Sequence, residues 1–144
     1  MSNFYFHVSP EAFNDGDIKQ KGSFGRLLAS DTQYVHDDPD GEFFREQVRE
    51  THYPNKPSRL KSSFVFEVLE DAKIFRDRRG QGEKIYRVSF ANEPTVTHRV
   101  CYTAWSMNHI NLEYQAYEFW SNPPIYATDT ELFAEVDLVI HGEA

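Results

Sequence analysis

A strict alternation of side chains from Glu131 to Ile140 constrains the fold of this chain more than any other sequence feature. Every second residue is apolar, and these residues are Leu132, Ala134, Val136, Leu138 and Ile140. A period of two is typical of a β-strand that buries one face. The run therefore predicts one long strand whose other face, with Glu131, Glu135 and Asp137, is charged.

Four further segments have the composition of strands. Phe4 to Val8 alternates in the same way and ends before Pro10, which interrupts a sheet. The others are Ser62 to Val68, Lys84 to Phe90 and Val96 to Ala104. We interpret the last two as a hairpin with a long loop.

Helices are expected between these strands. Asp38-Pro39 has the pattern of a helix start, and that helix ends before Pro54. A short helix is expected from Leu69 to Phe75, and aromatic residues recur at helical spacing between His109 and Trp120. The polar, glycine-bearing segment from Asn14 to Asp37 is interpreted as a long loop.

This order of elements predicts an α+β fold with a mainly antiparallel sheet and flanking helices. At 144 residues and 40% apolar content the chain suits a single domain over residues 1–144. Its formal charge of −8 disfavours general nucleic-acid binding. Cys101 is the only cysteine, and neither a signal peptide nor a membrane-spanning run is recognisable, so we expect a cytoplasmic protein without membrane contact.

Several common site patterns do not fit. Gly80-Gln81-Gly82 follows a helix and precedes a strand, the reverse of the order in a dinucleotide-binding glycine loop. The six histidines are scattered, so no metal site is expected. Glu131 and Glu135 share a strand face, but about 13 Å would separate them, beyond the roughly 5 to 9.5 Å that glycosidases use. A glycosidase would need a carboxylate from elsewhere in the fold.

The chain does resemble one enzyme family in short motifs. Phe6-His7-Val8-Ser9 resembles the first-strand motif of the His-Tyr-Glu branch of the ADP-ribosyltransferases, in which a histidine binds the NAD ribose and the nicotinamide amide. Gly22 to Arg26 is similar to the glycine-bearing segment that often follows. Lys56 to Glu67, with Leu69 to Lys73 behind it, resembles small bacterial domains assigned to that fold. Thr130 to Ala134 is similar to the start of the catalytic strand.

The resemblance implies a fold, a co-substrate and a set of site residues. It implies the split sheet of the family and NAD as the donor of ADP-ribose. It implies Glu131 as the catalytic residue, with Ser62 or Ser63 orienting its carboxylate. The NAD-binding residues that it implies are His7, Val8, Ser9, Arg26, Arg59, Tyr86 and Tyr117. In this set, the two arginines meet the diphosphate and one of the two tyrosines stacks on nicotinamide.

The chemistry explains why a carboxylate is needed. Cleavage of the bond between nicotinamide and ribose builds positive charge on the ribose ring, so a nearby carboxylate stabilises the transition state more than the ground state. The resemblance thus implies a mono-ADP-ribosyltransferase that modifies a macromolecule, more readily a protein than a nucleic acid, as a toxin-like phage or bacterial conflict effector. RNA phosphotransfer or plain NAD hydrolysis is a related activity on the same fold.

The acidic composition supports a second hypothesis of another class. A non-catalytic protein with the same fold would use its negative surface to occupy a basic protein partner. That protein would bind its partner in a salt-sensitive way and would not need NAD.

Overall fold

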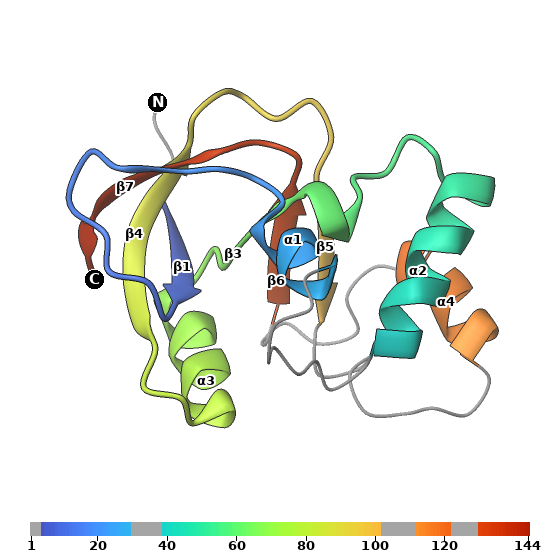
Figure 1. Cartoon of the computed structure of the whole chain (residues 1–144), viewed down its shortest axis with the longest axis horizontal. Coiled ribbons are helices and arrows are strands. Elements are labelled where there is room, and N and C mark those ends of the chain that lie inside the picture. The colour runs from blue at the N-terminus through green and yellow to red at the C-terminus, as the bar shows by residue number, and fades with distance from the viewer. Residues whose placement is uncertain (1–3, 30–38, 102–111, 122–129) are drawn as a thin grey trace.

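The computed structural model describes residues 4–29, 39–101, 112–121 and 130–144. Their elements confirm the α+β class (Figure 1). The strands are β1 (Tyr5–Ser9), β2 (Ile18–Lys19), β3 (Ser63–Val65), β4 (Lys84–Phe90), β5 (His98–Cys101), β6 (Thr130–Ala134) and β7 (Leu138–Glu143). The helices are α1 (Ser23–Ala29), α2 (Pro39–His52), α3 (Leu69–Arg79) and α4 (Leu112–Ser121), with a 3-10 turn, η1 (Arg59–Lys61), before β3.

The strands form two sheets in which every described pairing is antiparallel. The first sheet has the order β1-β4-β7-β2 and the second has the order β3-β6-β5. The sheets meet at one bridge, where the backbones of Phe6 and Phe66 exchange hydrogen bonds of 2.9 and 2.7 Å. The end of β1 is therefore fixed against the end of β3.

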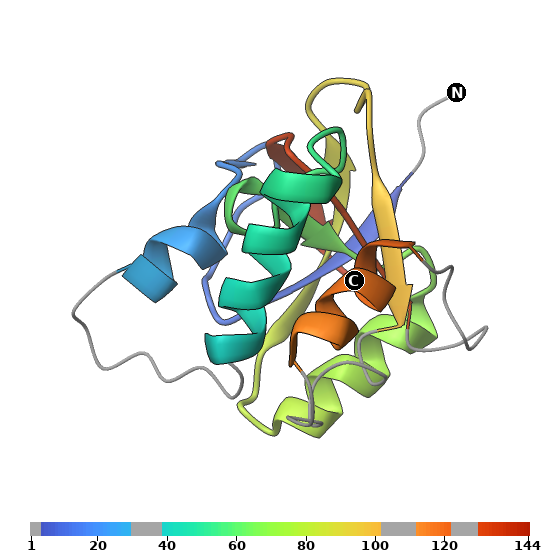
Figure 2. The same cartoon turned by 90° about the vertical axis from the view of Figure 1, so that its right-hand side faces the viewer.

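Three apolar clusters give the order of the layers. The cluster between the two sheets includes Val65 and Leu132 from one sheet and Val88, Leu138 and Ile140 from the other. A second cluster packs α3 against the outer face of the first sheet. The third packs α2 and α4, which lie side by side in Figure 2, against the outer face of the second sheet. Each fully buried aliphatic or aromatic side chain contributes about 1.5–3 kcal/mol to such cores.

The predicted long strand from Glu131 to Ile140 is wrong as a single element. The chain forms β6, turns at residues 135–137, and continues as β7 in the other sheet. The turn is held by Asp137, whose carboxylate accepts from the backbone N–H of Lys21 at 2.9 Å and whose carbonyl accepts from Ala91. One alternating run can thus form strands in two different sheets, because the inward side chains of both strands enter the same central cluster.

Two other predictions are corrected. The segment from Asn14 to Asp37 is not a plain loop, because β2 and α1 form within it. Segments β4 and β5 do not pair as a hairpin: β4 lies between β1 and β7, and β5 lies at the edge of the other sheet. The predicted parts at 30–38, 102–104 and 109–111 lie outside the described residues.

No helix in the described ranges combines the length and the apolar composition needed to cross a bilayer.

Candidate functional site

His7 lies where the two sheets meet and is almost completely buried. Its Nδ1 is 2.7 Å from the carbonyl oxygen of Phe64 in β3, and its Nε2 is 2.9 Å from Nζ of Lys19 in β2. A carbonyl only accepts, so Nδ1 carries the proton and Nε2 accepts from the lysine. Burial, reinforced by the positive charge of Lys19, lowers the pKa of His7 to about 3. The imidazole is therefore neutral at pH 7, with a fixed tautomer.

Lys19 is the centre of a small polar group beside His7. Its ammonium forms an ion pair of 3.0 Å with Glu11 and lies 3.4 Å from Oγ of Ser9, which is fully buried. The ammonium also lies over the ring of Phe13. The short strand β2 carries Lys19 here by pairing with β7. Two of the residues predicted to bind NAD, His7 and Ser9, are thus brought together around one cation.

Glu131 lies at the start of β6 and is buried, with 6% of the residue exposed. Its Oε1 accepts from Nη1 of Arg59 at 3.2 Å. Burial raises the pKa of this carboxyl above its ordinary value, and the charge and the hydrogen bond of Arg59 offset only part of that rise. This face of β6 is covered by α2 and α4, which pack around the fully buried Phe133.

Arg59 is shared between two carboxylates. Its Nε donates to both oxygens of Glu42 in α2, at 3.0 and 2.9 Å, while its Nη1 donates to Glu131. The guanidinium lies over four aromatic rings, from Phe24, Phe64, Phe119 and Phe133, at 4.9 to 5.7 Å from their centroids. Burial lowers the pKa of Arg59, but the two carboxylates outweigh this and raise it above its ordinary value.

Phe64 connects the two halves of the candidate site. Its backbone carbonyl accepts from His7, and its ring lies 4.9 Å from the guanidinium of Arg59, which holds Glu131. The ring also packs edge-on against Phe24 of α1. Phe64 therefore contacts both His7 and Arg59, the arginine that binds Glu131.

The two predicted serines do not orient Glu131. Oγ of Ser62 donates to the carbonyl of Ser58 at 2.6 Å, and Oγ of Ser63 donates to the carbonyl of Val136 at 2.7 Å. Ser63 pairs with Ala134 across the sheet and so faces the central cluster, opposite to Glu131. Both hydroxyls fix turns of the backbone, and Arg59 holds the carboxylate instead.

The remaining predicted residues are dispersed. Tyr86 pairs with His7 across β1 and β4, but its buried hydroxyl donates to the carbonyl of Glu11 and accepts from Phe13. Val8 packs in the cluster under α3. Arg26 donates to the carbonyls of Lys21 and Gln20.

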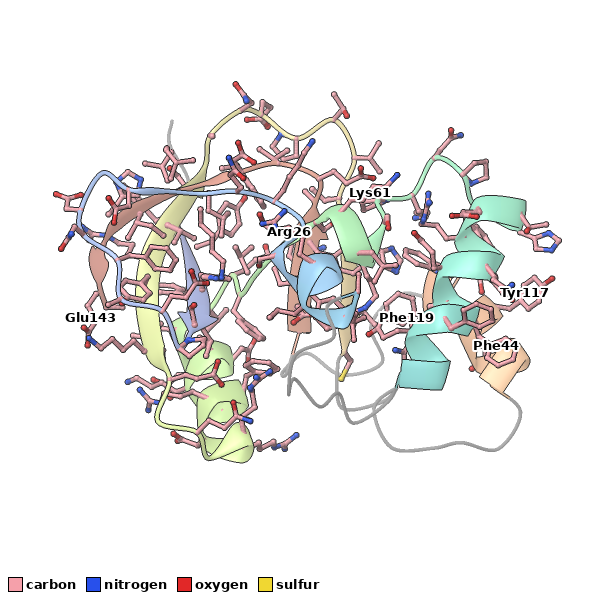
Figure 3. All side chains as sticks on the ribbon, in the orientation of Figure 1. Arg26, Phe44, Lys61, Tyr117, Phe119 and Glu143 are labelled. Carbon is pink, nitrogen blue, oxygen red and sulfur yellow. The ribbon has the colours of Figure 1, made fainter. Side chains whose placement is uncertain are left out.

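Tyr117 is held away from the sheet junction. Its hydroxyl lies 2.6 Å from Nε2 of His52 on α2. Figure 3 shows Tyr117 beside Phe44 on the far side of the helix pair, whereas Phe119 lies on the side toward α1. Tyr117 is thus not positioned beside His7.

A pocket of about 350 Å³ lies at the other end of β6. It is lined by Lys21, Pro54, Asn55, Lys56, Pro57, Thr95, Val96, Glu135 and Val136. None of the residues predicted to bind NAD lines it. We place the candidate site around Phe64 at the sheet junction, because the buried His7 and Arg59, the partner of the buried Glu131, both contact that residue.

Sequence reasoning missed Glu42 and Lys19. Glu42 with Arg45, and Glu46 with Arg49, are spaced three residues apart on α2, a pattern that also fits a solvated helix face. Only the packing of α2 on β6 shows that Glu42 is buried. Lys19 lies in the segment interpreted as a loop, so its contact with His7 had no local signal.

Comparison of the sequence with protein-family models and with curated proteins finds no match.

Proposed function

We propose that this chain is a mono-ADP-ribosyltransferase that binds NAD at the junction of β1 and β3 and uses Glu131 as its catalytic residue. One observation carries the proposal above all. A carboxylate at the start of a strand is buried and paired with Arg59, the guanidinium of Arg59 lies over the ring of Phe64, and the carbonyl of Phe64 accepts from a neutral buried histidine. That combination supports both parts of the reaction, the recognition of a ribose and the stabilisation of a cationic ring.

Glu131 would act on the ribose through its charge. As the bond between nicotinamide and C1′ of the ribose breaks, its electron pair leaves with nicotinamide and the ring becomes cationic. A fixed carboxylate in a water-poor environment stabilises that charge more strongly than one in bulk water. Arg59 supports the ionised form, because its charge and hydrogen bond offset part of the rise in the pKa of Glu131 that burial causes.

His7 would recognise the nucleotide. A neutral imidazole with Nδ1–H committed to Phe64 offers Nε2 as an acceptor for a ribose hydroxyl. That nitrogen now accepts from Lys19, so the hydroxyl would replace the ammonium. The displaced Lys19 then brings a positive charge close to the NAD diphosphate. Ser9 lies beside both groups and is a further polar contact for the nicotinamide end.

The acceptor of ADP-ribose is proposed to be a protein in the cytoplasm. The excess of acidic over basic residues supports this class, since a chain of charge −8 attracts basic protein surfaces and repels nucleic acid. A role as a phage or bacterial conflict effector belongs to the same proposal.

The binding part is tested by calorimetry with NAD on the wild type, on His7→Gln and on His52→Gln. Gln can still donate to Phe64 but is a poorer match for the ribose contact, so we expect about a tenfold loss of affinity in His7→Gln. His52 is an exposed histidine on α2, and its variant should bind like the wild type. Equal affinity in all three proteins, or no NAD binding to the wild type, would contradict the proposed site.

The acceptor is sought in the same series. NAD labelled in its adenylate part is incubated with each protein and a bacterial lysate. Label on a discrete protein band that depends on His7 supports transfer. Release of nicotinamide without a labelled band would assign NAD hydrolysis in its place.

A further inference from the structure

Glu42 is a buried acidic residue that the proposed reaction leaves unused. It lies on α2 with 4% of its side chain exposed and binds Nε of Arg59 with both carboxylate oxygens. Its Oε1 also accepts from Nη1 of Arg45 at 3.1 Å. Arg45 in turn lies over the ring of Phe119, and its backbone carbonyl accepts from Nε1–H of Trp120. Glu42 is thereby held on both sides.

The guanidinium of Arg59 has few ways to move while Glu42 holds it. Its planar donors are divided between Glu42 and Glu131, and four aromatic rings surround it. Arginine presents its donors in a fixed fork, so fixing Nε also fixes the direction of Nη1. The place of the Glu131 carboxylate therefore depends on a residue that does not touch it.

The electrostatic interactions also link Glu42 to Glu131. The groups that act on the ionisation of Glu131 are Arg59 from η1, Glu42 from α2 and Arg79 from α3. Arg59 and Arg79 lower the pKa of Glu131, whereas Glu42 raises it. Glu42 thus competes with Glu131 for one cation while it fixes that cation in place.

We propose that Glu42 is a positioning residue, which acts through Arg59 to set both the position and the charge of the Glu131 carboxylate. This inference rests on the function proposed above only for its catalytic consequence. This arrangement of Glu42 and Arg59 holds the Glu131 carboxylate in a fixed orientation without neutralising its charge fully. In a buried cluster each charged partner matters, because removal of one leaves the others uncompensated.

The test uses the full chain with Glu42→Gln and, as a matched control, Glu46→Gln. Glu46 lies one turn further along α2 and is bound to Arg49 and to Ser58, not to Arg59. Carbon-13 labelled glutamate reports the titration of each carboxyl by NMR, and the Glu131 signal is assigned by its loss in Glu131→Gln. We expect the Glu131 midpoint to move to lower pH in Glu42→Gln and to stay in place in Glu46→Gln.

The kinetic consequence separates positioning from binding. Nicotinamide release from NAD by Glu42→Gln should fall about 10- to 100-fold in kcat, because misplacement of a catalytic group costs about that much, while KM stays within about twofold. A loss that appears in KM alone would overturn the positioning role. If the wild type releases no nicotinamide, the proposed function fails, but the titration still decides whether Glu42 controls Glu131.

A second variant covers the case in which Glu42→Gln does not fold. Arg59→Lys has a single ammonium, which cannot serve both carboxylates as the fork does, so the Glu131 midpoint should move to higher pH. An unchanged Glu131 midpoint in a folded variant contradicts the inference. Loss of the fold in both variants also contradicts it, since the cluster would then be a requirement of folding.

Discussion

His98 and His7 are buried histidines that differ in what surrounds them. Nε2 of His98 donates to the carbonyl of Phe119 at 2.8 Å, and its ring packs against Phe119, Trp120 and Phe133. Burial lowers the pKa of His98 to about 4, with smaller effects from the hydrogen bond, which raises it, and from Lys56 and Arg59, which lower it. His98 is thus a core residue, whereas His7 has a lysine on its second nitrogen.

Because the pKa of His98 is lowered in the fold, we expect this residue to destabilise the protein in acid. Above pH 6.5 both the folded and the unfolded chain hold a neutral His98, and the full stability is present. As the pH falls from 6.5 toward 4, only the unfolded chain takes up the proton, so the free energy of unfolding falls by about 1.4 kcal/mol per pH unit. Urea unfolding of the wild type and of His98→Gln between pH 7 and pH 5 measures this slope.

The comparison with the variant isolates His98 from the other titrating groups. His7 contributes a slope of the same sign, and Glu131, whose pKa is raised, contributes one of the opposite sign. His98→Gln keeps a donor for the Phe119 carbonyl. This variant should therefore lose only the part of the pH dependence of the unfolding free energy that His98 contributes. An identical pH slope in both proteins would contradict this prediction, because it would mean that the pKa of His98 is the same in the folded and the unfolded chain.

Sequence reasoning at the residue scale found the candidate acid residue and the candidate histidine but not their partners. Glu131 and His7 stand in short motifs that are visible in the chain. The direction of the Ser62 and Ser63 hydroxyls is not visible, because it depends on turns at residues 58 and 136 that form only in the fold. Arg59 was expected at the site, yet the carboxylates that it binds come from two other elements.

At the scale of elements, α1 approaches η1 through a glycine. A Cβ at Gly25 would overlap the backbone carbonyl of Leu60, so a side chain there forces α1 away from the turn. That turn carries Arg59, and Phe24 of α1 lies against both Arg59 and Phe64. The helix that sequence reasoning overlooked thus covers the candidate site.

Gly25→Ala should therefore destabilise the chain through a steric clash. We expect a loss of about 1–3 kcal/mol in the free energy of unfolding, the usual cost of overpacking. Gly80→Ala is the comparison, because Gly80 has a φ of 62° with open space around its Cβ position and should cost about 1 kcal/mol. Denaturant unfolding of both variants gives the two values. A Gly25 variant as stable as the wild type would mean that α1 lies further from η1.

The alternating run from Glu131 to Ile140 shows what periodicity leaves open at this scale. It gave the inward residues of β6 and β7 correctly, since Leu132, Leu138 and Ile140 all enter the central cluster. It could not show the break at 135–137, because the chain changes sheets without changing its pattern. The predicted boundaries of β4, Lys84 to Phe90, agree with the observed ones, because a glycine turn and a helix end precede this strand.

At the scale of the whole molecule, the two sheets are joined at Phe6 and Phe66. Phe66 is 2% exposed and packs with Phe6, Ile85 and the residues of α3. Its backbone bridge to Phe6 is also the link that sets β1, and hence His7, beside β3. The arrangement of the sheets depends on long-range pairing, which the order of elements alone did not reveal.

Phe66→Ala should be costly for that reason. Removal of a buried phenyl group from a packed cluster costs about 3–5 kcal/mol in the free energy of unfolding. Val68→Ala, two residues away at a position that is 53% exposed, should change it by no more than about 0.5 kcal/mol. Thermal unfolding of the two variants measures the contrast. Similar losses in both would argue against a tight junction between the sheets.

The most direct measurement of the central claim is the rate of nicotinamide release from NAD by the wild type, by Glu131→Gln and by Glu70→Gln. Gln has the size of Glu but no charge, so Glu131→Gln should lose about 100-fold or more in kcat while it stays folded. Glu70 is exposed on α3, and its variant should match the wild type. If Glu131→Gln releases nicotinamide as fast as the wild type, or if the wild type releases none, Glu131 is not the catalytic residue of an ADP-ribosyltransferase.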